Sequence, residues 1–127
     1  MKEITKKWIE FVDKDLLLAK RNIDSKDFCE LIAFHLQQAL EKVLKAYIYE
    51  KTNKEPPRIH NLIGLVNLSG MELKNEEKDL LDDLNFVYTE SRYPQSIDEL
   101  RDFLDKIDLR ELYNKTERLI QWIKIKL

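Results

Sequence analysis

The chain has 127 residues and a net charge of −2, from 22 lysines and arginines against 24 aspartates and glutamates. This length predicts one domain over residues 1–127, and the balanced charge argues against broad, sequence-independent nucleic-acid binding, which requires a basic face. Since Cys29 is the only cysteine, neither an intramolecular disulfide nor a thiolate zinc site can form, and a reducing cytoplasmic setting is expected.

The predicted elements are all helical. Apolar residues recur three and four positions apart between the prolines and glycines, and no period-2 alternation indicates a strand. The first two helices are expected at about 5–24 and 28–51. A short turn separates them, and Ser25 or Asp27 is expected to cap the second helix. A loop with two adjacent prolines follows.

The second half of the chain continues this pattern with shorter segments. A helix is predicted at about 60–68, and a longer one begins at its cap, Asn75, and ends before Pro94. The stretch 95–106 holds one short helical segment, and the last helix starts at Asp108 and runs to the C-terminus. We therefore predict an all-α fold, an up-and-down bundle of four to five helices.

The predicted helix 28–51 combines an apolar face with a polar row. The apolar face is expected in the core and consists of Cys29, Ile32, Ala33, Leu36, Leu40, Val43, Leu44 and Tyr47. The polar row contains Gln38, Glu41, Lys42 and Lys45, at helical spacing and bordered by apolar residues. One interpretation is a solvated strip that contains a Glu41–Lys45 pair. The other is a groove that presents these groups to an anionic ligand or a second chain.

Two further segments carry candidate binding residues. His60, in "RIHNL", either caps a helix or contacts a ligand. Arg92, in "ESRYP", either satisfies the end of a helix or forms a forked contact with a phosphate or carboxylate. The two histidines, His35 and His60, have no metal-ligand spacing, and no cofactor fingerprint is present, so neither metal nor cofactor is expected. The apolar runs are too short for a signal peptide or a membrane span.

Taken together, "FHLQQALEKVLKA", "HNL" and "ESRYP" resemble the HEPN domain, named for higher eukaryotes and prokaryotes nucleotide binding. The resemblance covers most of the chain, and it rests on the order and spacing of all three segments. It implies a four- or five-helix bundle that often dimerises in the cytoplasm. It also implies frequent pairing with a small nucleotidyltransferase-fold protein in a two-component toxin–antitoxin system.

Many members of that family are metal-independent RNases whose motif is an arginine, four to six residues, then a histidine. The resemblance would give the histidine the role of general base, while the arginine steadies the phosphate charge. Here the positions that follow Arg92 at this spacing are Ile97, Asp98 and Glu99. No imidazole is available there to exchange a proton near neutral pH, so no catalytic residue is assigned.

The leading hypothesis is a non-catalytic HEPN protein that binds a nucleotide, a nucleotidyltransferase-fold partner, or both, as a homodimer. Tyr93 would stack on a base. One alternative is an RNase toxin that uses His60 or His35 in place of the missing histidine. Another is a purely structural homodimeric module with the polar row in its seam. The predicted binding residues are Gln38, Glu41, Lys42, Lys45, His60, Arg92 and Tyr93.

Overall fold

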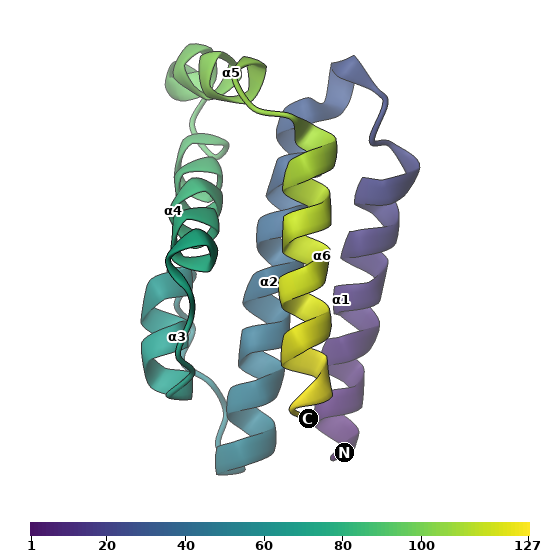
Figure 1. Cartoon of the computed structure of the whole chain (residues 1–127), viewed down its shortest axis with the longest axis vertical. Coiled ribbons are helices and arrows are strands. Elements are labelled where there is room, and N and C mark those ends of the chain that lie inside the picture. Colours follow the sequence, from purple (N-terminus) through teal and green to yellow (C-terminus); the bar gives the residue numbers. More distant parts are fainter.

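The computed structural model describes residues 1–127, and its regular elements are all helical, as the sequence predicts (Figure 1). The four long helices are α1 (Glu3–Arg21), α2 (Cys29–Thr52), α4 (Asn75–Glu90) and α6 (Leu109–Ile125). The shorter elements are α3 (Leu62–Ser69), α5 (Ile97–Asp105) and two 3₁₀ turns, Lys26–Phe28 and Pro94–Ser96. None of these helices combines the length and the apolar character that a membrane span requires.

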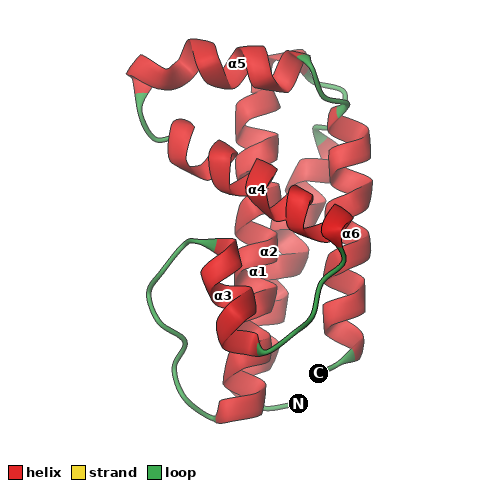
Figure 2. Cartoon of the chain, turned by 60° about the vertical axis from the view of Figure 1, so that its left-hand side comes forward, coloured by secondary structure: helices red, strands yellow, loops and turns green.

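The long helices run up and down the bundle (Figure 1). α1 rises from the end that holds both termini, α2 returns, α4 rises, and α6 returns again. α5 lies across the opposite end, and α3 lies beside the lower part of α2, after a long loop (Figure 2). α2 is the central element because it contacts α1, α3, α4 and α6.

The apolar face predicted for α2 forms the middle of the core. Leu36, Leu40 and Val43 are fully buried, in one cluster with apolar residues of every other long helix. Cys29 and Tyr47 are only half-buried at the edge of this cluster. Cys29 opens the helix, where fewer neighbours surround a side chain.

The predicted start of α4 needs correction, and that of α6 is confirmed. Asn75 is the first residue of α4 rather than its cap, because the Glu77 side chain accepts a hydrogen bond from the Lys74 backbone N–H at 2.8 Å. This contact satisfies a free N–H one residue earlier. Asp108 is the N-cap of α6, and its carboxylate accepts from the backbone N–H groups of the second and third residues after it.

The turn before α2 also differs from its prediction. Neither Ser25 nor Asp27 caps α2, because the 3₁₀ turn Lys26–Phe28 separates Ser25 from the helix and contains Asp27. Phe28 occupies the N-cap position and makes no side-chain capping bond. The exposed Phe28 side chain instead lines a small apolar hollow between α1 and α2.

The end of α2 anchors the start of α1. The Glu50 carboxylate accepts hydrogen bonds from the Lys2 backbone N–H at 3.1 Å and from the Thr5 hydroxyl at 2.6 Å. These bonds lower the pKa of Glu50, the Thr5 bond having the larger effect. A side chain of α2 thereby supplies an acceptor for the backbone N–H of Lys2, at the start of α1.

Candidate functional site

Three polar residues lie in one buried line on α2. Gln37, Glu41 and Lys45 are four residues apart, and their exposed fractions are 0%, 5% and 7%. A four-residue spacing puts side chains above one another on a helix. This side of α2 faces the segment that leads into α3, so the line is covered rather than solvated.

The Glu41 carboxylate is the centre of this line. It accepts hydrogen bonds from Lys45 Nζ at 3.1 Å and from Gln37 Nε2 at 3.2 Å, and its Oε1 lies 3.0 Å from His60 Nδ1. Every buried side-chain polar atom in the structure has a hydrogen-bond partner. The three donors therefore offset the cost of removing the carboxylate from water.

This network fixes the orientation of His60. Because a carboxylate only accepts, the Nδ1 that faces Glu41 carries a hydrogen, and Nε2 is left to contact a ligand. The His60 side chain is 48% exposed, so the imidazole is accessible from solvent. Gln37 Nε2 also donates to the His60 carbonyl oxygen at 3.3 Å, which holds the backbone of the same residue.

The residues after His60 hold this segment against the bundle. Asn61 is the N-cap of α3 and accepts from the Gly64 backbone N–H at 3.2 Å. The Leu62 side chain is fully buried, and its backbone N–H donates to Asn85 Oδ1 of α4 at 2.9 Å. The "HNL" segment thus consists of an oriented histidine, a helix cap and a core anchor.

Aromatic contacts join α4 to this surface. The Tyr88 ring stacks on the His60 ring with centroids 4.9 Å apart, and the Arg92 guanidinium carbon lies 5.0 Å from the same tyrosine centroid. Arg92 is also 5.8 Å from the Tyr93 ring, and both side chains are exposed. We call His60, Tyr88, Arg92 and Tyr93 the aromatic–basic surface. It presents an imidazole, a guanidinium and an aromatic ring side by side.

A second buried carboxylate lies on the α1 side of α2. Asp15 is 7% exposed, and it accepts a hydrogen bond from Lys42 Nζ at 2.6 Å, while His35 Nδ1 lies 2.9 Å from its other oxygen. Lys42 Nζ also lies 5.6 Å from the centroid of the exposed Phe11 ring. Lys42 and His35 therefore face α1, away from the Glu41 network.

Comparison with known proteins identifies the family of this chain. The family model described as the HEPN domain matches residues 5–126. The chain belongs to the HEPN domain family. No curated protein and no solved structure matched it. The three segments that suggested this HEPN fold lie on α2, at the start of α3 and at the end of α4. Glu41 contacts His60, and both His60 and Arg92 contact the Tyr88 ring.

The HEPN structure brings together most of the predicted binding residues. Glu41, Lys45 and His60 are in direct contact, and Gln38 joins them because its Nε2 donates to Gln37 Oε1 at 2.7 Å. Arg92 and Tyr93 reach this group through Tyr88. Lys42 is the exception, because its ammonium group is paired with Asp15.

Three residues that take part in these contacts were absent from the predicted site. Asp15 lies on the apolar face of the first helix, where a lone carboxylate signals a buried partner. Gln37 gives the same signal on α2, because it lies among fully buried residues. The sequence gives no such signal for Tyr88, because its spacing on α4 is that of an ordinary core aromatic residue.

Proposed function

We propose that this HEPN protein is non-catalytic and binds a nucleotide through the aromatic–basic surface. The observation that carries the proposal is the placement of His60 and Arg92 against one ring, Tyr88, with both polar groups accessible. The guanidinium is suited to the charge and the planar geometry of a phosphate. The exposed Tyr93 ring, 46% accessible, offers a stacking surface for a base.

The Glu41 network gives this surface its rigidity. Lys45 and Gln37 bind Glu41 from within α2, so their role is to hold His60 rather than to contact the ligand. A ring that is oriented before binding loses less conformational entropy when a ligand arrives. Gln38 is half-buried beside Gln37 and adds an amide that can orient a ligand.

Nucleotide titration tests the binding proposal. ATP and AMP are titrated into the wild-type protein and into Arg92→Ala, and heat or a fluorescent analogue reports binding. Loss of a charge-assisted contact should weaken affinity about tenfold or more. Arg58→Ala is the matched control, because Arg58 lies two residues before His60 and its side chain is 93% exposed. Equal affinities for the wild type and Arg92→Ala would reject the proposal.

The same surface suits a protein partner with an acidic patch, and the proposed partner is a nucleotidyltransferase-fold protein. A pull-down with a small nucleotidyltransferase-fold protein of the same organism tests this part. We expect Arg92→Ala to reduce capture and Arg58→Ala to leave it unchanged. Capture that is equal in all three proteins would place the partner elsewhere.

An exposed apolar strip on α1 favours a homodimer. Ile4, Phe11 and Leu18 recur every seven residues and are 43%, 52% and 41% exposed. Residues seven apart share one face of a helix, and Phe28 and Leu31 continue the strip beside Leu18. Contiguous exposed apolar surface is typical of protein–protein interfaces. Lys42, beside Phe11, borders this strip.

Light scattering and sedimentation test the dimer. Phe11→Asp should shift the dimer toward monomer, whereas Ile125→Asp should not, although Ile125 is 84% exposed. Lys42→Ala distinguishes a purely structural module from a ligand-binding one. If Lys42→Ala changed the dissociation of the dimer but not the affinity for nucleotide, Lys42 would belong to the dimer interface and not to a ligand site.

The second candidate function is RNA cleavage, and the Glu41–His60 contact favours it. The buried carboxylate orients the ring so that Nε2 can accept the proton of an RNA 2′-hydroxyl, while Arg92 steadies the charged phosphate. Structured and single-stranded RNA are incubated with the wild type, His60→Ala, Arg92→Ala and Arg58→Ala. Cleavage that requires His60 and Arg92, but not Arg58, would establish the enzyme. No cleavage at high protein concentration would reject it.

A further inference from the structure

The side-chain amide of Gln38 lies at the edge of the Glu41 network. Gln38 is half-buried on α2, directly after the fully buried Gln37. The two ends of a glutamine amide have nearly the same shape, but the nitrogen donates hydrogen bonds and the oxygen accepts them. The partners of each end therefore decide which end of Gln38 is left for a ligand.

Two acceptors fix the orientation of Gln37. Its Nε2 lies 3.2 Å from Glu41 Oε1 and 3.3 Å from the His60 carbonyl oxygen. A carboxylate and a carbonyl oxygen only accept hydrogen bonds, so the amide nitrogen has to face them. The reversed amide would put an oxygen against two other oxygens in a fully buried position. Leaving buried polar groups unpaired in this way is costly.

Gln37 in turn fixes the orientation of Gln38. Because the Gln37 nitrogen faces Glu41, its Oε1 is the atom that remains, and it accepts a hydrogen bond from Gln38 Nε2 at 2.7 Å. The nitrogen of Gln38 therefore faces Gln37. The three side chains form a chain of hydrogen bonds that runs in one direction, from Gln38 through Gln37 to Glu41.

The Gln38 Oε1 atom is thus a free acceptor. The hydrogen bond of the Gln38 side chain within the protein is the one that Nε2 donates to Gln37. Since every buried side-chain polar atom has a hydrogen-bond partner, an oxygen without one lies at the accessible surface. The negative charge of Glu41 polarises both amides along the chain, which makes the last oxygen a stronger acceptor.

This acceptor adjoins the aromatic–basic surface. Gln38 lies one helical turn after Phe34, and the Phe34 ring stacks on the Tyr88 ring with centroids 6.1 Å apart. The other neighbour of Tyr88 is the His60 ring. Gln38 is also linked to His60 through Gln37, which donates to the His60 carbonyl oxygen. The free oxygen and the aromatic rings are therefore available to one ligand.

A free acceptor and a guanidinium suit opposite ends of a nucleotide. Phosphate oxygens are negatively charged acceptors, so Gln38 Oε1 repels them and the Arg92 guanidinium attracts them. The edge of a base carries N–H donors, and the amino group of adenine is one that glutamine side chains commonly bind. The base end of a nucleotide therefore fits Gln38 and its phosphate end fits Arg92.

From these features we propose that Gln38 determines base specificity, because its Oε1 accepts a hydrogen bond from an amino group of the bound base. This role rests on the proposed nucleotide binding and adds which part of the ligand α2 recognises. Gln37 and Glu41 are positioning residues, since they hold the Gln38 amide with its oxygen toward the ligand. A base without an amino group loses this bond, and an amide that was free to turn would discriminate less.

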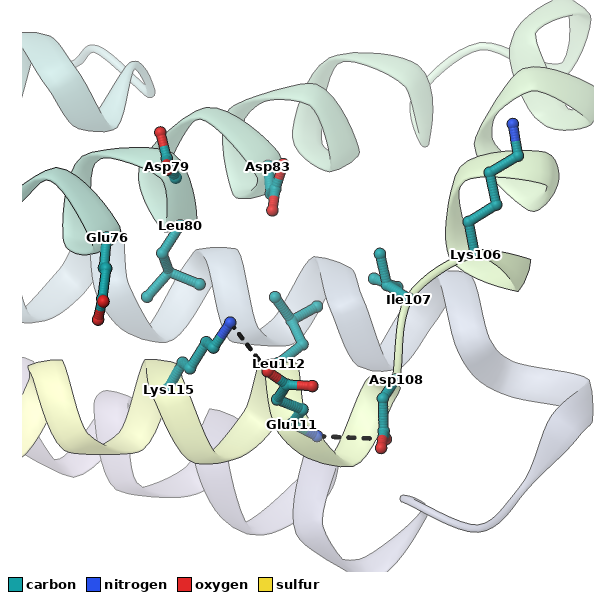
Figure 3. A pocket seen from close by; sticks show the side chains of 10 residues that line it. All are labelled: Glu76, Asp79, Leu80, Asp83, Lys106, Ile107, Asp108, Glu111, Leu112 and Lys115. Carbon is teal, nitrogen blue, oxygen red and sulfur yellow. Dashed lines mark hydrogen bonds and ion pairs between the residues drawn. The ribbon is translucent and has the colours of Figure 1, made fainter.

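A hollow between α4 and α6 is the contrasting site (Figure 3). Its volume is about 340 Å³, and five carboxylates and two lysines are among its lining residues. One of these lysines, Lys115, is already paired with Glu111 at 3.0 Å. This balance of charge repels a phosphate. Asp79 and Asp83, which line the hollow on α4, therefore report a nucleotide bound at the wrong place.

Two nucleotides that differ by one amino group test the proposal. AMP carries the 6-amino group, and purine riboside 5′-monophosphate is the same molecule without it. Isothermal titration measures the affinity of both for the wild type, Gln38→Leu, Arg92→Ala and Gln121→Leu. Gln121 provides the matched control, because it is an exposed glutamine on a different helix, α6.

We expect the wild type to bind AMP about three- to tenfold more tightly than the nucleotide without the amino group, as one hydrogen bond would supply. Gln38→Leu should bring this ratio close to one. Arg92→Ala should weaken both nucleotides by the same factor and preserve the ratio, because both carry the same phosphate. Gln121→Leu should change neither affinity.

Side-chain amide resonances test the orientation of Gln38 without any nucleotide. In the wild type, the Nε2 hydrogen that bonds to Gln37 should resonate downfield of a free glutamine amide. Gln37→Met removes the acceptor, so this hydrogen should return to the ordinary position, and the preference for AMP should decrease with it. Resonances of Gln38 that match a free amide in the wild type would contradict the fixed orientation.

The remaining outcomes separate this role from nucleotide binding itself. Equal affinities of the wild type for the two nucleotides would reject base recognition by Gln38 and leave nucleotide binding intact. A ratio that survives Gln38→Leu, or that Gln121→Leu lowers equally, would also reject it. Shifts of the backbone amides of Asp79 and Asp83 on addition of AMP, without shifts at His60, would place the ligand in the hollow. If neither nucleotide binds, the proposed function fails, and the role of Gln38 fails with it.

Discussion

Glu41 illustrates how one buried side chain can organise a surface. Its carboxylate joins two residues of its own helix to His60, which comes from a separate segment. A buried ion pair of this kind adds little net stability, because its attraction is offset by lost hydration. Its value lies in orientation, since it fixes the imidazole and, through Tyr88, the neighbourhood of Arg92.

Removing one member of this network should be costly. Lys45→Ala leaves the Glu41 carboxylate buried beside only two donors, and we expect the free energy of unfolding to fall by about 3 kcal/mol. The double variant Glu41→Leu with Lys45→Met should recover much of that loss, because no buried charge remains. Urea unfolding of the wild type and both variants measures this. A loss below about 1 kcal/mol in Lys45→Ala would mean that the pair is solvated.

Asp83 should behave in the opposite way. Its pKa in the folded protein lies above the ordinary value of 3.8, so the folded state favours the neutral form. The free energy of unfolding of the wild type should therefore fall as the pH rises from below 3.8 through the raised pKa of folded Asp83. Asp83→Asn avoids this loss, so it should be more stable than the wild type at neutral pH and closer to it in acid. Thermal unfolding at several pH values tests this, and a less stable variant at neutral pH would contradict it.

The predictable part of the candidate site is the part formed by residues of a single helix. Glu41 and Lys45 are recognisable because they are four residues apart on an otherwise apolar helix. The separation of Lys42 from this group was not predictable, since its partner Asp15 lies on another helix. Pairing between distant segments depends on how the helices rotate against one another, which spacing within a single helix does not fix.

At the scale of the elements, the number and order of helices follow from hydrophobic spacing and from the positions of proline and glycine. Predicted boundaries differ from the observed ones by one to three residues in the first and third helices. Local contacts also set the starts of α4 and α2. Glu77 satisfies the N–H of Lys74, and the 3₁₀ turn Lys26–Phe28 delays the start of α2. Such contacts leave little trace in the periodicity.

The junction between α1 and α2 should depend on pH through Glu50. The hydrogen bond from Thr5, followed by that from the Lys2 backbone, lowers the pKa of Glu50 below its ordinary value of 4.5. Its stabilising effect is therefore present above that value and lost as the pH falls through the lower, folded pKa. Glu50→Gln should reduce the difference in unfolding stability between neutral and acidic pH. Glu55→Gln, with a 79% exposed side chain, is the control and should not.

At the scale of the whole molecule, α2 is the shared support of the helices packed around it. Its buried residues join the α1 side of the bundle to the α4 and α6 sides in one core. A single core of this kind predicts one cooperative unfolding transition. A destabilising substitution in the buried face of α2 should therefore lower the free energy of unfolding of the whole bundle, rather than unfold one edge of it.

Leu40→Ala tests this dependence. Leu40 is fully buried in the middle of α2, and its truncation should cost about 2–5 kcal/mol through lost burial and the cavity left behind. Leu68→Ala is the matched control, because Leu68 is 57% exposed, and it should change stability by less than about 0.5 kcal/mol. Urea unfolding followed by circular dichroism and by tryptophan emission should give coincident curves. Two separate transitions would contradict a single core.

Both chain ends emerge at one pole of the bundle, whereas α5 crosses the other (Figure 1). A short glycine-rich bridge between the first and last residues would thus give a circularly permuted chain, and new ends could be opened in the exposed loop at residues 53–55. Likewise, immobilising the protein through residue 1 or residue 127 would present the α5 pole to a ligand in solution.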